Sequence, residues 1–520
     1  MNTFLTKPLK FKLGQNVNDV QAVCKFVGVS PSKAKVWLYK QSVDARKKDD
    51  VHFVCSYVVQ TDKSQLKNAT PFSLPQDYLE NPTKTQRSQK VIVVGAGPAG
   101  LFSARYLSAV GFDITVVEKG ADVEQRRLDV EEFFRGGKFN AKSNVQFGLG
   151  GAGTFSDGKL TTGISSPLTA TVFNEFVRSG APKEILTSNL PHIGTDKLVS
   201  VVANLRNSIV QSGGKFLFNT TVTNFVVQNG VCYGVQLDDG RTLLCDHVLL
   251  CCGHSARDVF QLLCNMGVEM QFKPFAVGVR IEHTRDFVNK SQYGMFATHK
   301  DLGSASYKLA HQVDKTHACY SFCMCPGGVV VPANSTENAV VVNGMSYHAR
   351  NQVNSNSALV VSVTKEDVEA YGFGTDCLAG MRFQQHLENL AFQVGGGNYV
   401  APSQSVASFC NVQQVGETVT PSYPRGVQQC NLHDILPQQI CHCLEQGLQA
   451  FNKKIHGFGT SGVLTGVETR TSSPVKILRN GAFHSSIANL YPVGEGAGYA
   501  GGIVSSAVDG LRVAMSIADN

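Results

Sequence analysis

A glycine-rich loop has the residue types and spacing that bind the pyrophosphate of a dinucleotide: Gly95-Ala96-Gly97-Pro98-Ala99-Gly100. The first glycine permits a tight turn, the second lets the pyrophosphate approach the backbone, and the third lets a helix pack closely on a strand. Glu118 follows 23 residues after Gly95, where an acid accepts hydrogen bonds from the adenosine ribose and disfavours a 2′-phosphate. The pattern therefore predicts a dinucleotide-binding site.

The elements around this loop are those that such a site requires. An apolar run at 90–94 predicts a strand buried on both faces, and the run 101–110 predicts a helix. A second apolar run at 113–117 ends directly before Glu118. Together they form one βαβ unit, which places the pyrophosphate at the amides and positive dipole end of the helix that begins near Pro98.

Three features favour FAD over NAD as the dinucleotide. The loop continues as Gly-Pro-Ala-Gly-Leu, which is common in flavoproteins, and the apolar strand 248–252 ends in Gly253. Near the end of the chain, an apolar run leads to Gly494 and Glu495, then to a glycine-rich loop and a final helix at 503–518. FAD folds use such a late acid near the ribityl and phosphate groups, whereas NAD-only Rossmann domains lack this return.

Composition restricts the class of protein. The chain has 520 residues, 42% hydrophobic and 17% charged, so it can bury sizeable cores. The net charge of +7 comes from scattered basic residues, and without a basic stripe nucleic acid is not expected as a partner. No 18 consecutive residues are apolar, so no membrane-spanning helix is expected. The 15 cysteines lack paired CxxC spacings, which indicates thiols in a reducing compartment, by default the cytoplasm.

The pattern along the chain predicts an α/β fold. We expect an FAD-binding Rossmann-like domain with a parallel sheet, an inserted β-rich substrate domain and a small N-terminal α+β domain. Residues 1–60 would form the small domain, of ferredoxin-like type, and 61–88 have the composition of a linker. We assign 89–262 and 461–520 to the FAD-binding domain and 263–460 to the substrate or cap domain.

Shorter elements are expected within these domains. In the small domain, Asn18 would cap a helix over 20–27, and two alternating runs flank the polar segment 44–50 as in a long-looped hairpin. In the FAD-binding domain we expect three further strands, at 216–227, 231–237 and 243–250.

Several motifs between residue 90 and the C-terminus are specific. They are Glu118–Val123 with Arg126, the segments 143–148 and 150–160, Gly253–Asp258, Gly278–His283, Cys323–Gly328 and Gly494–Ile503. On these motifs the chain resembles the uncharacterised FAD-dependent dehydrogenase family, whose members carry a small N-terminal α/β domain. The segment 44–48 resembles part of that first domain.

The resemblance implies a defined set of residues around FAD. They are Gly95, Gly97, Gly100, Glu118, Arg126, Gly151, Gly153, Val222, Gly253, Glu495, Gly502 and Ile503, to which we add the neighbouring Pro98, Ala99, Lys119 and Gly494. Reduction of a flavin at N5 leaves negative charge at N1 and the C2 carbonyl. Backbone amides of residues 501–505, at the start of the final helix, would stabilise that charge.

The sequence does not define the catalytic acid or base. Arg280, Glu282 and His283 alternate at a strand end, a pattern that fits a substrate-facing role and a salt-bridged, solvent-facing strand equally well. Arg470 lies just before the final strand and is a candidate for binding an anionic substrate or steadying the flavin. Arg280, His283 and Arg470 are therefore the candidate catalytic residues.

Two cysteines, Cys323 and Cys325, would share one face of a strand. Redox or sulfur chemistry is one interpretation, but nothing in the sequence predicts a lowered thiol pKa, so packing is the favoured one. The nearby histidines and cysteines match no zinc spacing, and no metal is expected.

These observations predict an FAD-dependent oxidoreductase, a dehydrogenase that moves a hydride between an unidentified small molecule and flavin N5. With one intact dinucleotide loop, NAD(P)H stays open as the electron donor if it binds without a Rossmann domain. Two alternatives remain. In one, FAD is structural or sensory and the N-terminal domain docks a protein or an RNA; in the other, the protein is a flavin hydroxylase.

Overall fold

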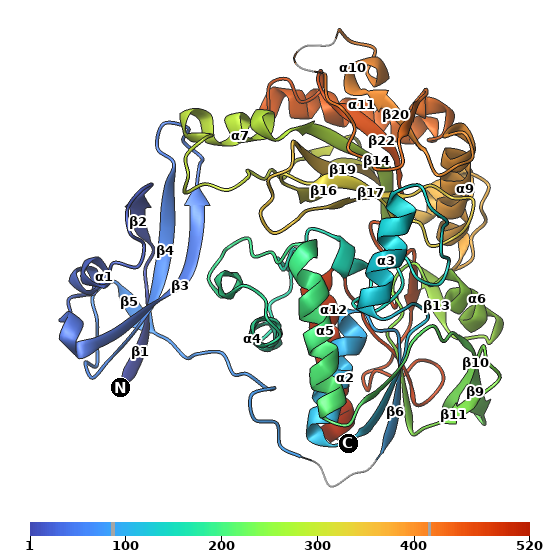
Figure 1. The fold of residues 1–520 in the computed structure, drawn as a ribbon, viewed down its shortest axis with the longest axis horizontal. Helices are drawn as coiled ribbons and strands as arrows, with labels where there is room; N and C mark the ends of the chain where they lie inside the picture. Colours follow the sequence, from blue (N-terminus) through green and yellow to red (C-terminus); the bar gives the residue numbers. More distant parts are fainter. Residues whose placement is uncertain (85–88, 414–415, 417, 520) are drawn as a thin grey trace.

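The computed structural model describes residues 1–84, 89–413, 416 and 418–519, so the end of the expected linker, 85–88, lies outside it. Figure 1 shows a small sheet domain at one side of a larger body, in which a helix-covered sheet lies below a β-rich layer. Within the described ranges, no helix has the length and apolarity needed to cross a bilayer.

The N-terminal domain is a sheet with a helix packed on it. Its elements are β1 (Asn2–Thr6), β2 (Leu9–Lys12), α1 (Val20–Val27), β3 (Ala34–Asp44), β4 (His52–Thr61) and β5 (Ala69–Pro71). The strand order is β2-β4-β1-β5, with β3 paired to β4. Between residues 1 and 84 the structure has this one α-helix, so the β-α-β-β-α-β order of a ferredoxin-like fold is absent there.

Two local expectations have different outcomes in this domain. The hairpin is confirmed, because β3 and β4 pair antiparallel along their length. The predicted cap is wrong by one residue, since it is Asp19, not Asn18, whose carboxylate accepts the amide of Ala22 at 3.1 Å. Strand β5, within the range expected to be linker, extends the sheet by pairing with β1.

A five-stranded parallel sheet forms the centre of the body and confirms the Rossmann-like prediction. Its strands, in spatial order, are β24 (Leu490–Pro492), β12 (His247–Leu250), β6 (Lys90–Val94), β7 (Asp113–Val117) and β8 (Lys215–Leu217). We call this sheet and its helices the parallel-sheet domain. The helices include α2 (Pro98–Val110), α3 (Val123–Phe134), α4 (Leu168–Arg178), α5 (Thr195–Gln211), α6 (Arg257–Asn265) and α12 (Ile503–Asp519).

The final helix packs directly on the helix that follows the glycine-rich loop. A Cβ on Gly510 of α12 would lie 2.3 Å from the carbonyl oxygen of Ala99, so the two backbones touch at this crossing. The hydroxyl of Ser103 donates to the carbonyl of Gly510 at 3.0 Å. The first and last segments of the parallel-sheet domain are therefore held against each other.

Two of the ranges expected to form a single strand each contain two shorter strands. The range 216–227 contains the end of β8 and then β9 (Val222–Gln228), separated where Asn219 has a φ of +53°. The range 243–250 contains β11 (Thr242–Leu244) and β12. β9 and β11 flank β10 (Val231–Leu237) in a separate antiparallel sheet. Polar residues mark both breaks, Asn219 to Thr221 in the first range and Asp246 and His247 in the second, and the expected strands ran across them.

A seven-stranded sheet organises the β-rich domain. Its order is β15 (Ala310–Gln312), β16 (Ala318–Cys325), β19 (Asn354–Val363), β14 (Phe275–Thr284), β22 (Val463–Glu468), β20 (Ala401–Ser405) and β21 (Val427–Gln429). Around it lie α7 (Arg285–Tyr293), α8 (Lys365–Ala370), α9 (Ala379–Val394), α10 (Val406–Phe409), α11 (Gln438–Lys454) and the paired strands β17 (Val329–Pro332) and β18 (Val342–Met345). Because β22 belongs to this sheet, the chain returns to the parallel-sheet domain after Glu468 and not at 461. On that return β23 (Val475–Ile477) pairs with β13 (Met270–Phe272).

The N-terminal domain contacts the body through β3 and the loop after it. Gln41 exchanges backbone hydrogen bonds with the segment after α4, to Thr187 at 2.7 Å and from Asn189 at 2.8 Å. The side chain of Lys48 donates to the carbonyl of Gln292 in α7, and Figure 1 shows the β3–β4 loop reaching that helix. Docking of a protein or an RNA by this domain stays a prediction.

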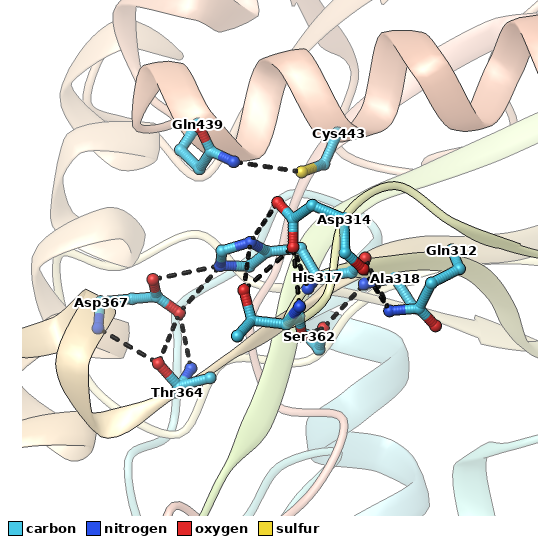
Figure 2. A network of polar contacts seen from close by, with 10 residues as sticks. Gln312, Asp314, His317, Ala318, Ser362, Thr364, Asp367, Gln439 and Cys443 are labelled. Carbon is cyan, nitrogen blue, oxygen red and sulfur yellow. Dashed lines mark hydrogen bonds and ion pairs between the residues drawn. The ribbon is translucent and has the colours of Figure 1, made fainter.

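A polar network joins two peripheral parts of the β-rich domain. Figure 2 shows the ring of His317 between Asp314, in the turn before β16, and Asp367 at the start of α8. Its Nδ1 lies 2.8 Å from the Asp314 carboxylate and its Nε2 3.1 Å from that of Asp367. The same Asp367 carboxylate accepts the amide of Thr364, the N-cap of α8, at 2.8 Å. The network therefore fixes the turn before β16 to α8.

Candidate functional site

The carboxyl ends of four parallel strands lie together at one edge of the central sheet. β6 leads into Gly95, β7 into Glu118, β12 into Cys251 and β24 into Val493. The strand order reverses beside β6, because β7 lies on one side of it and β12 and β24 lie on the other. Ligands of open α/β sheets bind at such a switch point.

A cavity of about 370 Å³ opens at this edge. One wall is the glycine-rich loop after β6 together with the first turn of α12. The opposite wall belongs to the β-rich domain and its junction with the parallel-sheet domain: Phe322, Cys323, Asn343, Glu468, Arg470 and Thr471. Small-molecule pockets measure about 300–1,000 Å³, so this cavity has the size of a ligand-binding site.

Four glycines on the wall leave space where a side chain would stand. Gly253, Gly501 and Gly502 have no atom within 4 Å of the position of a Cβ, and Gly97 has the Cα of Gly151 at 3.9 Å. All four line the cavity. Such a cradle fits a pyrophosphate and a ring system that approach the backbone closely.

Two other glycines of the loop serve the fold. A Cβ on Gly100 would lie 2.0 Å from the carbonyl oxygen of Gly95, and one on Gly95 would lie 2.8 Å from that of Cys251. Gly95 also has a φ of +102°, which favours glycine. Gly95 and Gly100 are therefore needed for packing, whereas Gly97 leaves space on the cavity wall.

Glu118 holds three loops together at the end of β7. One carboxylate oxygen accepts the amide of Ala96 at 2.8 Å, and the other accepts those of Gly120 and Gly148, each at 2.9 Å. The residue is 5% exposed and lines the cavity. A carboxylate has about four acceptor positions, so the oxygen that binds Ala96 retains capacity for a ribose hydroxyl.

Most residues implied for the cofactor line this cavity: Gly95, Gly97, Pro98, Ala99, Glu118, Lys119, Gly151, Gly153, Val222, Gly253, Glu495, Gly502 and Ile503. Three lie behind the wall instead. Gly100 packs against Gly95, the amide of Gly494 donates to Asp509 at 2.8 Å, and Arg126 is fully buried.

Arg126 of α3 shapes the loop that faces Gly97. Its guanidinium donates to the carbonyl oxygens of Asn144, Val145, Leu149 and Gly151 at distances between 2.7 and 3.0 Å. Burial lowers its pKa to about 10. Its place in the structure is therefore that of a buried clamp on the 144–151 loop.

Of the two interpretations of Arg280, Glu282 and His283, the solvent-facing strand is wrong, because all three are buried. Arg280 lies behind the cavity wall and pairs with Glu468, with its Nη1 2.8 and 2.9 Å from the two carboxylate oxygens. Although Arg280 opposes it, burial raises the pKa of Glu468 to about 7. Glu282 accepts the hydroxyl of Ser422 at 2.5 Å.

His283 lies in the core of the β-rich domain and not on the cavity wall. Its ring stacks on Phe287, with centroids 4.9 Å apart, and lies 4.6 Å from the ring of Phe458. Its Nε2 is 3.1 Å from the carbonyl oxygen of Phe458, and burial lowers its pKa to about 4. This position gives His283 no contact with a ligand in the cavity.

Arg470 does reach the cavity, as one of two arginines that share a buried carboxylate. Both Arg257 and Arg470 bind Glu388 with two hydrogen bonds, at 2.7 to 3.0 Å. Although burial alone would raise it, the two guanidinium groups hold the pKa of Glu388 at about 2. Two cations on one anion leave this part of the wall with net positive charge.

Several wall residues had no role assigned from the sequence. Asp157 and Lys159 lie within the motif 150–160, and Asp157 accepts the Nε of Arg350 at 2.9 Å. His254 also lines the cavity, and burial lowers its pKa to about 4. Cys323, assigned to packing, also lies on the wall. The motifs that contain these residues could be recognised in the sequence. The sequence did not show that β16 folds against the carboxyl edge of the central sheet.

Two family models match the chain. The model described as "FAD-dependent protein, C-terminal domain-like" matches residues 274–471, and that described as "NAD(P)-binding Rossmann-like domain" matches 93–126. A protein of Clostridium beijerinckii, itself named as uncharacterised, is 42% identical over 525 residues, which cover 98% of this chain and 97% of that one. The chain belongs to this family of FAD-dependent proteins. The predicted resemblance is confirmed, and FAD is the cofactor that the family implies.

Solved structures resemble this FAD-dependent protein at low similarity. CtdE in complex with FAD and substrate 4 is 11% identical, with a TM-score of 0.35, over 83% of this chain and 81% of that one. An oxidoreductase from Methanosarcina mazei is 14% identical, with a TM-score of 0.32, over 83% of this chain and 100% of that one. These are distant likenesses.

Proposed function

We propose that the protein is an oxidoreductase that transfers a hydride between a small organic molecule and N5 of its FAD. One observation carries the proposal: a continuous cavity runs from the glycine-rich loop and the start of α12 to polar side chains of the β-rich domain. Hydride chemistry is supplied by the flavin when it is bound, and the protein supplies binding, orientation and charge.

The loop after β6 would hold the phosphates of FAD. The first amides of a helix have no partner within it, and Pro98 and Ala99, at the start of α2, line the cavity. Gly97 leaves the space that a pyrophosphate needs there. The free acceptor position of Glu118 would take a hydroxyl of the adenosine ribose.

The start of α12 would stabilise negative charge on the reduced ring. Gly501, Gly502 and Ile503 line the cavity where this 17-residue helix begins. Its first amides and its dipole present positive charge. Backbone amides held by a helix need no reorganisation when charge develops, which makes them effective at such a place.

The opposite wall favours a substrate with an anionic group. The cluster of Arg257, Arg470 and Glu388 carries one net positive charge, and the cluster of Lys159, Arg350 and Asp157 carries another. Burial raises the pKa of two carboxyl groups on the wall, Glu468 and Glu495, to about 7. These groups would hold or take up a proton near neutral pH.

Anaerobic reduction of the bound flavin tests the proposal. The purified protein should carry FAD and be yellow, and its flavin absorbance should bleach with a member of a panel of small organic acids and their uncharged analogues. A matched Gly97→Ala protein should fold but retain less FAD after purification, so its bleaching should be smaller in proportion.

Three other outcomes would overturn the proposal. A protein that takes up no FAD removes its basis. Flavin that no donor reduces favours a structural or sensory cofactor. NAD(P)H oxidation coupled to incorporation of oxygen into a substrate favours a flavin hydroxylase.

A further inference from the structure

Cys323 lies on the wall of the cavity beside Phe322. It belongs to a bulge of β16, because Phe322 pairs with Ala358 while Cys325 pairs with Asn356, so β16 has one residue more than its partner strand. Cys323 has a φ of +43°, a conformation that residues other than glycine rarely adopt. Such strained residues cluster at functional sites.

A second thiol lies directly behind the first. Cys325 is fully buried, and its thiol donates to the carbonyl oxygen of Cys323 at 3.3 Å. The Nη2 atom of Arg280 donates to the same carbonyl oxygen at 2.5 Å and lies 3.3 Å from the sulfur of Cys325. Glu468 and Asn356 hold the guanidinium in place, each at 2.8 Å. A buried cation thus fixes both cysteines.

The surroundings favour negative charge on the outer thiol. A hydrogen bond from Cys325 lowers the pKa of Cys323 to about 5 against the effect of burial, and Lys159 and Arg280 act in the same direction. Burial raises the pKa of Cys325, which therefore keeps its proton. Burial also raises the pKa of Cys252, on the wall of the same cavity, to about 12. A thiolate is the reactive form of cysteine, so Cys323 and Cys252 differ sharply in expected reactivity.

We propose that Cys323 and Cys325 are a redox-active dithiol that exchanges one electron pair with the flavin in this cavity. In the oxidising direction a bond forms between the two sulfur atoms, and the S–H bond of Cys325 breaks. Its proton and the two electrons pass to oxidised FAD, which becomes the reduced anion. The inference rests on the proposed binding of FAD in this cavity.

Contact between the two side chains permits the disulfide, since Cys325 hydrogen-bonds the thiol of Cys323. Even in a fully extended strand, residues two apart have Cα atoms only about 6.6 Å apart, and disulfides span up to about 6.8 Å. The bulge at Cys323 breaks the regular alternation of β16, so the approach of the two sulfur atoms depends on this contact. A role in packing alone does not account for a thiol on the cavity wall with a buried cation and a second thiol behind it.

A reductive titration of the holoprotein tests the dithiol. The protein is oxidised with diamide, freed of the reagent and titrated with dithionite without oxygen while the flavin absorbance is followed. Wild type should consume four electrons per flavin, two for FAD and two for the disulfide. Cys323→Ser and Cys325→Ser should consume two, and the matched control Cys252→Ser, from the same cavity, should consume four.

The two cysteine variants should also differ from each other. Cys325→Ser leaves Cys323 able to carry the negative charge next to the ring, so its oxidised flavin should show a long-wavelength charge-transfer band. Cys323→Ser should show none. A band in both variants, or in neither, would contradict the assignment of Cys323 as the sulfur next to the flavin.

Alkylation of the wild-type protein tests the dithiol without any substitution. In FAD-free protein near neutral pH, iodoacetamide should modify Cys323 at least about tenfold faster than Cys252, as measured by mass spectrometry of peptides. After diamide, Cys323 and Cys325 should both be protected and should share one disulfide.

The results separate the two proposals. A protein that binds FAD but consumes two electrons per flavin, with Cys323 no more reactive than Cys252, overturns the dithiol and leaves the oxidoreductase proposal intact. A protein that binds no FAD overturns the oxidoreductase proposal and, with it, electron exchange with the dithiol.

Discussion

The carboxylate of Glu118 accepts the backbone amide of Gly148 at 2.9 Å, and it also accepts those of Ala96 and Gly120. The acid expected to bind a ribose therefore also holds three loops of the site together. We expect Glu118→Ala to lower the free energy of unfolding of the FAD-free protein by on the order of 3 kcal/mol, because three buried amides lose their acceptor. Urea unfolding of both FAD-free proteins measures the difference.

Glu118→Gln is the matched control, because its one remaining side-chain oxygen still accepts hydrogen bonds. Its loss should be smaller than that of Glu118→Ala. Equal unfolding midpoints for Glu118→Ala and wild type would show that these hydrogen bonds do not stabilise the loops.

Gly97 and Gly100 should separate cofactor binding from folding. A Cβ at Gly97 has 3.9 Å to its nearest neighbour, whereas one at Gly100 would lie 2.0 Å from a carbonyl oxygen. Gly97→Ala should therefore keep the circular dichroism and melting temperature of the FAD-free protein and weaken FAD binding by about tenfold or more, which corresponds to about 1.4 kcal/mol. Gly100→Ala should lower the melting temperature itself.

Equilibrium dialysis with FAD and a thermal melt of each FAD-free protein check this pair. Unchanged FAD affinity in Gly97→Ala would mean that the cofactor does not lie against this loop.

Glu388 should make the protein sensitive to acid. Arg257 and Arg470 hold its pKa at about 2, below the ordinary value of 4.5, although burial opposes them. The folded protein therefore binds this proton less tightly than the unfolded one. The resulting stability is present above about pH 4.5 and is lost as the pH falls toward 2.

Glu388→Gln should remove this dependence and destabilise the protein at neutral pH by about 3–5 kcal/mol, because two buried guanidinium groups lose their counter-ion. Urea midpoints of both proteins at several pH values between neutral and acid give the two slopes. Parallel slopes would contradict the assignment of the acid sensitivity to Glu388.

His317 should give the opposite pH dependence of stability to Glu388. Burial alone would lower its pKa, but the carboxylates of Asp314 and Asp367 raise it above 6.5 (Figure 2). The folded protein binds this proton more tightly, so the stabilisation is fully present below about pH 6.5 and is lost as the pH rises through the raised pKa. We expect on the order of 1 kcal/mol.

Thermal melts of wild type and His317→Gln check this sign. The melting temperature of the variant should fall below that of wild type at about pH 6 and approach it at about pH 9, where the ring is neutral in both states of the wild type. A gap that widens with pH would contradict the two ion pairs.

The parallel-sheet domain was predictable because its signals are local. The turn at Gly95–Gly100, the buried strand before it and the acid at Glu118 all follow from backbone geometry within about 30 residues. The return at Glu495 was predictable in the same way. Gly100 and Gly494 show the limit of such reasoning, because a glycine needed for packing and one needed by a ligand look alike in sequence.

The opposite wall was not predictable because it depends on contacts between distant segments. Arg280 meets Glu468 across 188 residues, and Arg257 meets Glu388 across 131. Alternation at Arg280 and Glu282 was compatible with solvent exposure, but β14 is central in a seven-stranded sheet and is buried along nearly all its length. The lowered pKa of Cys323 was not predictable, because the bulge that brings the Cys325 thiol to it, and the approach of Lys159 and Arg280, depend on the fold.

Because α12 packs on α2, the parallel-sheet domain cannot finish folding until α12 has been synthesised. On a ribosome, the turn at Gly97 emerges some 400 residues before Gly502 and Ile503, which form another part of the same wall. A nascent chain therefore presents the glycine-rich loop long before the other part of this wall. The wall is complete only once Gly502 and Ile503 have been synthesised and have folded against that loop.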